Sequence, residues 1–158
     1  MVTTLQKAYS ILQFKENIMK RVLKMALLGA LLASAAVSAA TLQVKIDGVA
    51  SGKGKLRVAV CDESTFLKKC AIGALAPAHA GSVTVDVPDV PTGTWAVMAY
   101  HDENDNQKLD RNELGIPSEG YGFSNGATAK NGPPQFKQAA VIVGAGVTTV
   151  PVQITLKY

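Results

Sequence analysis

The segment "HDENDNQKLDRNELG", residues 101–115, has the residue types and the spacing of a calcium-binding loop. With Asp102 as position 1, oxygen-bearing side chains stand at positions 1, 3, 5, 9 and 12, which are Asp102, Asn104, Asn106, Asp110 and Glu113. Lys108, at position 7, would contribute its backbone carbonyl. Ca²⁺ takes roughly six to eight oxygen ligands, and the EF-hand loop supplies them at these positions. The spacing therefore predicts a Ca²⁺ site at 102–113.

Charge also favours a cation here, although two features differ from a true EF-hand. Residues 101–113 carry a net charge of −3, and like charges this close repel one another. Gln107 occupies position 6, where the EF-hand has glycine, and a non-glycine residue at positive φ costs about 1 kcal/mol. A strand precedes the segment, and Pro117 comes too soon for an exiting helix. The alternatives are a solvated Asn/Asp-rich turn and a site for Mg²⁺ or Mn²⁺.

The other residues that could support catalysis do not form a recognisable hydrolase, zinc or glycosidase site. Ser124 lies in a G-x-S-x-G sequence, but no histidine follows it to serve as a base, so a hydrolase is rejected. His79 and His101 are the only histidines, and two nitrogens make a poor zinc site; we assign His79 to a surface loop and His101 to a strand end. Glu103 and Asp105 are near neighbours in an acidic loop, which fits solvated groups better than a glycosidase pair.

The acidic segment continues into residues 114–135, which show no strand or helix pattern. Irregular loops of this length are usually functional or disordered. Glu119 is a further candidate oxygen ligand for the ion. Tyr121, Phe123 and Asn125 form a candidate contact loop. The two rings either fold over the calcium site or, as we favour, cover the open end of the core.

Period-two alternation predicts the strands that would position these loops. They cover residues 42–46, 55–60, 82–87, 94–100, 137–143 and 147–156. The run at 94–100 is nearly continuously apolar, which suits a central strand. The last two are expected to form a closing hairpin, and Pro151 favours an edge position because it lacks a ladder donor. Only residues 63–69 favour a helix, of one or two turns.

Short strands with Gly and Pro at the turns are typical of sandwiches and small barrels. We predict an all-β protein, an antiparallel Greek-key β-sandwich of about six or seven strands. It would have one short helical turn and one long irregular loop.

The N-terminal region has the pattern of a secretory signal. From Met19, a basic head of Lys20, Arg21 and Lys24 precedes the apolar run 26–37 and a small-residue cleavage signal near Ala39/Ala40. The apolar run is too short to span a bilayer, which needs about 20 residues. We predict an upstream extension plus signal peptide at 1–40 and a single domain at 41–158, exported to the periplasm or the cell surface.

Removal of the prefix changes both the charge and the redox environment of the chain. The formal charge of +4 lies wholly within residues 1–40, and residues 41–158 hold 11 basic and 11 acidic groups. A neutral domain gives no electrostatic reason to expect nucleic acid or anionic membrane as a partner. Cys61 and Cys70 are the only cysteines, and in an oxidising compartment we expect them to form a disulfide.

The acidic segment and the loop after it also carry a family resemblance. "HDENDNQKLDRNELGIPSEGYGFSNG" together with "GPPQF" resembles the signature of an exported bacterial family, domain-of-unknown-function family 2141. The resemblance extends over nearly the whole mature chain. It implies an immunoglobulin-like or prealbumin-like β-sandwich and implies no activity. The family's usual pattern has Gly at the place of Gln107.

These observations favour an exported, non-enzymatic β-sandwich module with a calcium loop, in a binding or structural role in the cell envelope. Its partner would be an envelope or extracellular protein or a glycan. The alternative is a small-molecule carrier or enzyme with a pocket beside the calcium loop.

Overall fold

A computed structural model describes residues 39–128 and 132–158 of the chain. The predicted signal peptide and its upstream extension lie almost wholly outside these residues. The first strand begins at Ala39, and Ala40 is buried in the core, so the predicted cleavage position falls at the start of that strand. No helix within the described ranges is long and apolar enough to cross a membrane.

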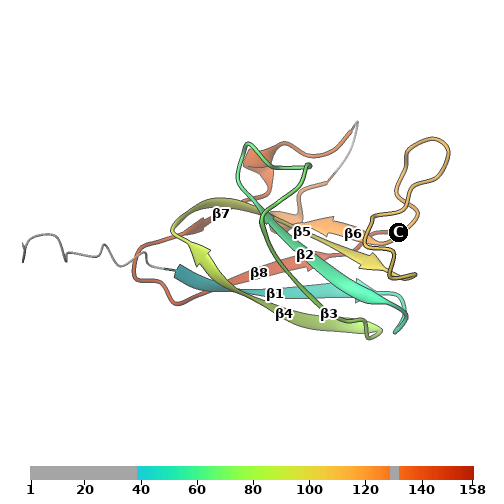
Figure 1. The fold of residues 1–158 in the computed structure, drawn as a ribbon, viewed down its shortest axis with the longest axis horizontal. Coiled ribbons are helices and arrows are strands. Elements are labelled where there is room, and N and C mark those ends of the chain that lie inside the picture. Colours follow the sequence, from blue (N-terminus) through green and yellow to red (C-terminus); the bar gives the residue numbers. More distant parts are fainter. Residues whose placement is uncertain (1–38, 129–131) are drawn as a thin grey trace, which may run out of the picture. The chain divides into compact units, whose positions relative to one another are not determined.

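Eight strands form two packed sheets in the described residues, which confirms the all-β sandwich (Figure 1). The strands are β1 (Ala39–Val49), β2 (Lys55–Cys61), β3 (Ile72–Pro77), β4 (Gly81–Pro91), β5 (Gly93–Asp102), β6 (Tyr121–Phe123), β7 (Ala140–Val143) and β8 (Thr149–Thr155). The smaller sheet has the order β4-β1-β8. In the larger sheet the order is β3-β2-β5-β6, and β7 also pairs with β5.

The core lies between the sheets and is built by the alternation seen in the sequence. Successive side chains of a strand point to opposite faces, and the apolar set of each strand points inward. The predicted inward residues Leu42, Val44, Ile46, Leu56, Val58 and Val60 are all buried in one cluster. At about 25 cal/mol per Å² of buried apolar surface, this cluster supplies the main driving force for folding.

The two C-terminal strands do not form the predicted hairpin. β7 pairs antiparallel with β5 in the larger sheet, whereas β8 pairs parallel with β1 in the smaller one. The chain therefore passes from one sheet to the other at the Gly144–Val147 turn, where the Val147 N–H donates to the Gly144 carbonyl. The hairpin prediction is wrong because alternation predicts a strand but not its partner. The predicted edge position of the strand containing Pro151 is confirmed.

β5 is apolar on both faces because both faces are covered. Val97 and Ala99 face the main core, and Ala96 packs on the outer side in a second cluster with Cys61, Phe66, Phe123 and Ala139. The loop at 62–70 and the segment after β6 supply this cover (Figure 1). Phe66 meets Phe123 and Phe136 edge to face, with ring centroids 6.1 and 5.8 Å apart. The predicted central strand is confirmed.

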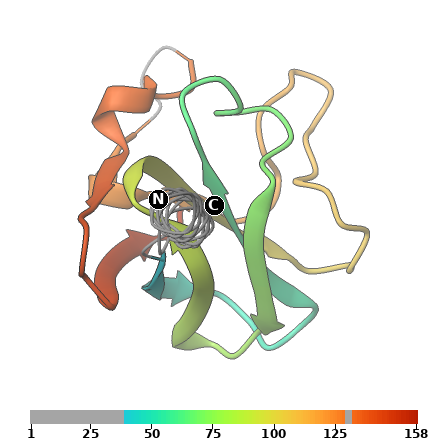
Figure 2. The same cartoon turned by 60° about the vertical axis from the view of Figure 1, so that its left-hand side comes forward.

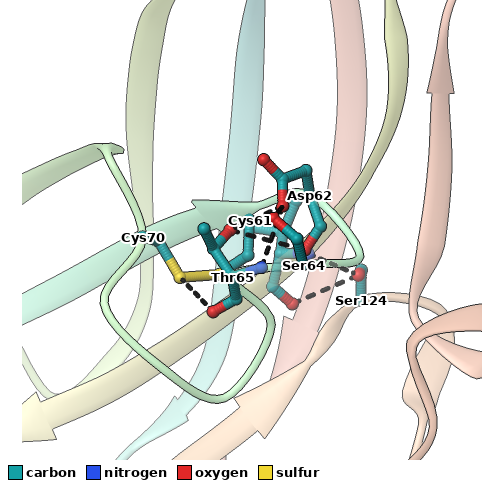
Figure 3. Close-up of a disulfide and its surroundings, with 7 residues drawn as sticks. Cys61, Asp62, Ser64, Thr65, Cys70 and Ser124 are labelled. Carbon is teal, nitrogen blue, oxygen red and sulfur yellow. Dashed lines mark hydrogen bonds between the residues drawn. A yellow bond between two sulfur atoms is a disulfide. The ribbon is translucent and has the colours of Figure 1, made fainter.

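A disulfide joins Cys61 at the end of β2 to Cys70 and closes the loop between them (Figure 3). Its Cα atoms are 4.9 Å apart, and closing so short a loop stabilises the fold by roughly 2 to 3 kcal/mol on the chain-entropy model. Asp62 fixes the enclosed turn, because its Oδ1 accepts from the Ser64 hydroxyl and the Thr65 N–H. These residues form turns, so the helix predicted at 63–69 is wrong. The described helices are the single 3₁₀ turns η2 (Ser124–Gly126) and η3 (Phe136–Gln138).

The sequence analysis did not predict two of the strands, β3 and β6. β3 runs through "IGALAP", and its glycine lies so close to Val58 that an added Cβ would be 2.4 Å from the Val58 carbonyl oxygen. β6 has only three residues, within the stretch predicted to be irregular. β3 lacks a clear alternation of apolar and polar residues, and β6 is too short to show one.

Ser124 fills an interruption along one edge of β5. Ala96 pairs with Ala140 of β7 and Met98 pairs with Phe123 of β6, which leaves Val97 between the two partners. The fully buried Ser124 Oγ accepts from the Val97 N–H at 3.1 Å and lies 2.5 Å from the Ala139 carbonyl oxygen, to which it donates. The hydroxyl of the G-x-S-x-G sequence therefore completes a sheet edge.

Replacing Ser124 with alanine should lower the free energy of unfolding by about 1 to 3 kcal/mol, because the buried Val97 N–H loses its acceptor. Urea denaturation of Ser124→Ala and of Ser82→Ala measures this. Ser82 is the control because its hydroxyl bonds Asp47 at the exposed surface, where a change of less than about 0.5 kcal/mol is expected. Equal effects of the two substitutions would contradict the bridging role of Ser124.

Candidate calcium loop

Asp102, the first predicted ligand, is the last residue of β5 and is fully buried. Its carboxylate accepts three hydrogen bonds. Oδ2 accepts from Arg57 Nε at 2.5 Å and from the Gln107 N–H at 2.9 Å, and Oδ1 accepts from the Asn106 N–H at 2.9 Å. A buried carboxylate is tolerated only when it is paired and hydrogen-bonded. Asp102 therefore anchors the following loop to the sheet through the loop's own backbone.

Two cations on the outer face of β2 neutralise part of the loop. Arg57 Nη2 reaches Asp105 Oδ1 at 2.9 Å as well as binding Asp102, and Lys55 Nζ lies 2.7 Å from Asp105 Oδ2. The hydrogen bond from Lys55 lowers the pKa of Asp105, and the hydrogen bond to Asp102 raises the pKa of Arg57. The negative charge that argued for a bound metal is thus offset in part by the protein itself.

The side chains at predicted positions 3, 5 and 9 converge on one point. Asn104 Nδ2 donates to Asp110 Oδ2 at 2.7 Å, and Asn106 Nδ2 lies 2.9 and 3.0 Å from the two Asp110 oxygens. The hydrogen bond from Asn106 is the main cause of a lowered pKa of Asp110, and Asn104 adds to it. The spacing of the sequence therefore brought together three of the predicted ligands.

The loop backbone is built from local side-chain turns. Asn104 Oδ1 accepts from the Asn106 N–H and Asn106 Oδ1 from the Lys108 N–H, at 3.1 and 2.8 Å. Asp105 and Gln107 have φ of 56° and 69°. The expectation that Gln107 stands where the chain needs positive φ is confirmed.

Glu119 closes the loop from the opposite side. Its Oε1 accepts from the Glu103 N–H at 2.9 Å and its Oε2 from the Asp110 N–H at 3.1 Å, and the residue is buried. The carboxylate therefore spans the two ends of the segment 103–110. The structure places Glu119 at the loop, as the sequence suggested, and gives it two backbone partners there.

Glu113 lies apart from this network, in a small hairpin. Arg111 and Pro117 form a bridge, and Asn112 Oδ1 accepts from the N–H groups of Leu114 and Ile116, both at 3.0 Å. Glu113 is exposed at the turn and makes no hydrogen bond or ion pair with another described residue. In the described ranges, no three His, Cys, Asp or Glu side chains are grouped to hold a metal, so any ion site would depend on the Asn104 and Asn106 amide oxygens.

The two histidines lie outside this network of hydrogen bonds. His79 is exposed in the turn after β3. His101 is fully buried, with Nε2 2.7 Å from the Lys53 carbonyl oxygen and Nδ1 2.8 Å from the Tyr158 hydroxyl. A carbonyl oxygen accepts only, so Nε2 carries a proton and donates. His101 therefore ties the chain end to the turn before β2.

Tyr121 and Phe123 of the predicted contact loop belong to strand β6, and Asn125 lies in the 3₁₀ turn η2 that follows it. Tyr121 and Phe123 pair with Tyr100 and Met98 of β5 and pack in or against the second cluster. Both rings therefore lie on the outer face of the larger sheet, away from the main core between the sheets. The Asn125 side chain donates to the Ala140 carbonyl oxygen at 2.7 Å.

Arg57 and Lys55 are the site residues that the sequence analysis missed. The signal was present in "KLRVAV", where the polar positions of an alternating strand are both cationic. Only the pairing of β2 with β5, which sets Lys55 opposite Asp102, shows that these cations face the acidic loop.

Residues 44–151 match a bacterial protein family described as "Uncharacterized protein conserved in bacteria (DUF2141)". The chain belongs to this family. The match includes the candidate calcium loop, both cysteines, the second half of β1 and all of strands β2 to β7. The resemblance seen in the sequence is thereby confirmed. No curated protein and no solved structure matches the chain.

Replacing Arg57 with glutamine should lower the free energy of unfolding by about 3 kcal/mol, because the buried Asp102 loses its charge partner. Lys55→Gln is the matched control. Both members of the Lys55–Asp105 pair are about two-fifths exposed, where an ion pair contributes less than about 1 kcal/mol. Guanidinium denaturation of both variants measures the difference, and equal losses would refute the special role of Arg57.

Glycine at position 107 should stabilise the protein by about 1 kcal/mol relative to alanine there, because glycine alone adopts positive φ without a Cβ clash. Thermal unfolding of Gln107→Gly and Gln107→Ala tests this. The same pair of substitutions at Lys108, whose φ is not positive, should give the opposite order, since glycine then only adds chain entropy to the unfolded state. The same order at both positions would contradict the argument.

Proposed function

We propose that this DUF2141 protein is an exported, non-enzymatic β-sandwich module whose loop at 102–113 binds Ca²⁺. The convergence of Asn104, Asn106 and Asp110 beside the anchored Asp102 carries the proposal. The loop would then present an ordered surface to an envelope or extracellular protein or a glycan.

Export is supported by two independent features. The N-terminal sequence has the basic head, apolar run and small-residue cleavage signal of a secretory peptide. The Cys61–Cys70 disulfide is of a kind that persists in oxidising compartments.

The distribution of charge points to the part of the loop that would hold the ion. Asp102 and Asp105 are paired with Arg57 and Lys55, whereas Asp110 is held by two neutral amides. Carboxylate and amide oxygens are ligands that Ca²⁺ accepts. Binding would exchange the amide–carboxylate hydrogen bonds for contacts between the ion and oxygen atoms. The Lys108 carbonyl, Glu113 and Glu119 remain the further predicted ligands.

Calorimetric titration of the chelator-stripped protein with Ca²⁺ should give a one-site isotherm. Bound ion stabilises the folded state by about 2.7 kcal/mol at a hundred times Kd, so melting should rise with Ca²⁺ and fall back with EDTA. The same concentration of Mg²⁺ should not change the melting temperature, because Mg²⁺ demands a smaller and more regular site.

Asp110→Asn should weaken calcium affinity about tenfold or more, because it removes the negative charge of a carboxylate that is held by neutral amides and not by an ion pair. Asp86→Asn is the control, since it removes the same charge from an exposed strand position outside the loop. Absence of both heat and a melting shift in the parent protein would refute the calcium site. The loop would then be a polar turn with Arg57 and Lys55 as its cations.

The alternative function, carriage of a small molecule, is favoured by one observation. A cavity of about 470 Å³ lies beside the hairpin 111–117 and over the outer face of β5 and β6. Enzymatic use of it has no such support, because the Ser124 hydroxyl is buried in the sheet edge.

A further inference from the structure

Two loops, 62–70 and 103–119, rise from the larger sheet (Figure 2). Residues of both loops line a mainly apolar cavity beside the hairpin 111–117. Met98, Tyr121 and Phe123 of β5 and β6 form its floor. Leu67 belongs to the disulfide loop on one side, and Leu109 and Ile116 belong to the calcium loop and its hairpin on the other. Its volume of about 470 Å³ falls within the range of about 300 to 1,000 Å³ that is usual for small-molecule sites.

The disulfide loop holds a leucine at the mouth of this cavity in a costly conformation. Leu67 has φ of 60° and is 42% exposed. A left-handed backbone in a bulky residue costs roughly 1 to 2 kcal/mol, and such strain persists where the surroundings enforce it. Here the enforcement comes from the Cys61–Cys70 bridge and from the Asp62 turn.

The opposite wall is fixed as well. The Asn112 side chain holds the N–H groups of Leu114 and Ile116, and Arg111 Nη1 donates to the Gly115 carbonyl at 2.8 Å. This hairpin leaves Ile116, which lines the cavity, 56% exposed. Exposed large apolar residues that gather around a concavity mark a binding site more often than a solvated surface.

Among the described residues that line the cavity, Arg111 is the only charged one. A guanidinium has five N–H donors, and one of them is used by Gly115. We propose that the cavity binds a small amphipathic anion, with an aliphatic or aromatic body on the apolar floor and a carboxylate or similar head on Arg111. The inference rests on the alternative function above, carriage of a small molecule, and its test is made without calcium.

Decanoate and its neutral analogue decan-1-ol are the probes, titrated into the purified protein in EDTA. Two-dimensional amide NMR gives both the affinity and the location. Saturable shifts at the amides of Leu67, Leu109, Gly115 and Ile116 are expected, with decan-1-ol about tenfold weaker, since a charge-assisted contact is roughly twice as strong as a neutral one.

Variants separate the head group from the body. Arg111→Gln should reduce decanoate affinity about tenfold and leave decan-1-ol unchanged, whereas Arg111→Lys should retain most of the preference for the anion. Lys53→Gln removes an equal charge elsewhere and should have no effect. Ile116→Ser should weaken both probes about fivefold through lost apolar contact. Ile142→Ser, at an isoleucine that is 74% exposed and does not line this cavity, should weaken neither.

Different results would refute the choice of an anion and the carriage of any small molecule at this site. Equal affinities for both probes, unchanged in Arg111→Gln, would overturn the choice of an anion and leave small-molecule carriage standing. If neither probe shifts the amides of the cavity, or if the shifts centre on β7, both the anion and carriage at this site are refuted.

Discussion

The ion pair between Arg57 and the buried Asp102 is the contact on which the candidate calcium loop depends. A carboxylate without exposure to water must have its charge and lone pairs satisfied inside the protein. Asp102 meets this requirement with one guanidinium and two N–H groups from its own following loop. The same bonds that satisfy the charge therefore fix the course of the chain after β5. Glu119 repeats the arrangement from the other side with the N–H groups of Glu103 and Asp110.

The protein has two partly independent apolar layers, one on each face of the larger sheet. The main core between the sheets needs only alternating apolar side chains and holds the sandwich together. The second cluster, on the outer face of the larger sheet, is where the disulfide, Phe66 and Phe123 meet. Because β5 contributes to both layers, its end positions the candidate calcium loop while its outer face forms the floor of the cavity. The two candidate sites thus share one strand, although the ligands proposed for them differ in chemistry.

Strain is concentrated in the loops that border these sites. Leu67, Asp105 and Gln107 all have positive φ, which is unfavourable for residues with a Cβ. The disulfide and the Asp62 turn hold the loop around Leu67. Lys55 and Arg57 hold the Asp105 side chain. The Gln107 N–H donates a hydrogen bond to Asp102. Rigid loops of this kind suit recognition, because a preorganised site loses less entropy when it binds.

The sequence by itself determined local features of the main core and of the acidic loop. Alternation identified the inward residues of β1 and β2, the acidic spacing identified Asn104, Asn106 and Asp110 as neighbours, and the position of Gln107 in that spacing indicated its positive φ. These are local properties, set by the pleat of a strand and the reach of a short loop. Only the tertiary structure decided that β8 lies parallel to β1, that Ser124 bridges Val97 and Ala139, and that Arg57 and Lys55 serve the acidic loop. Those outcomes depend on which distant strands pair and in what register, and alternation leaves that choice open because every amphipathic strand offers the same apolar face.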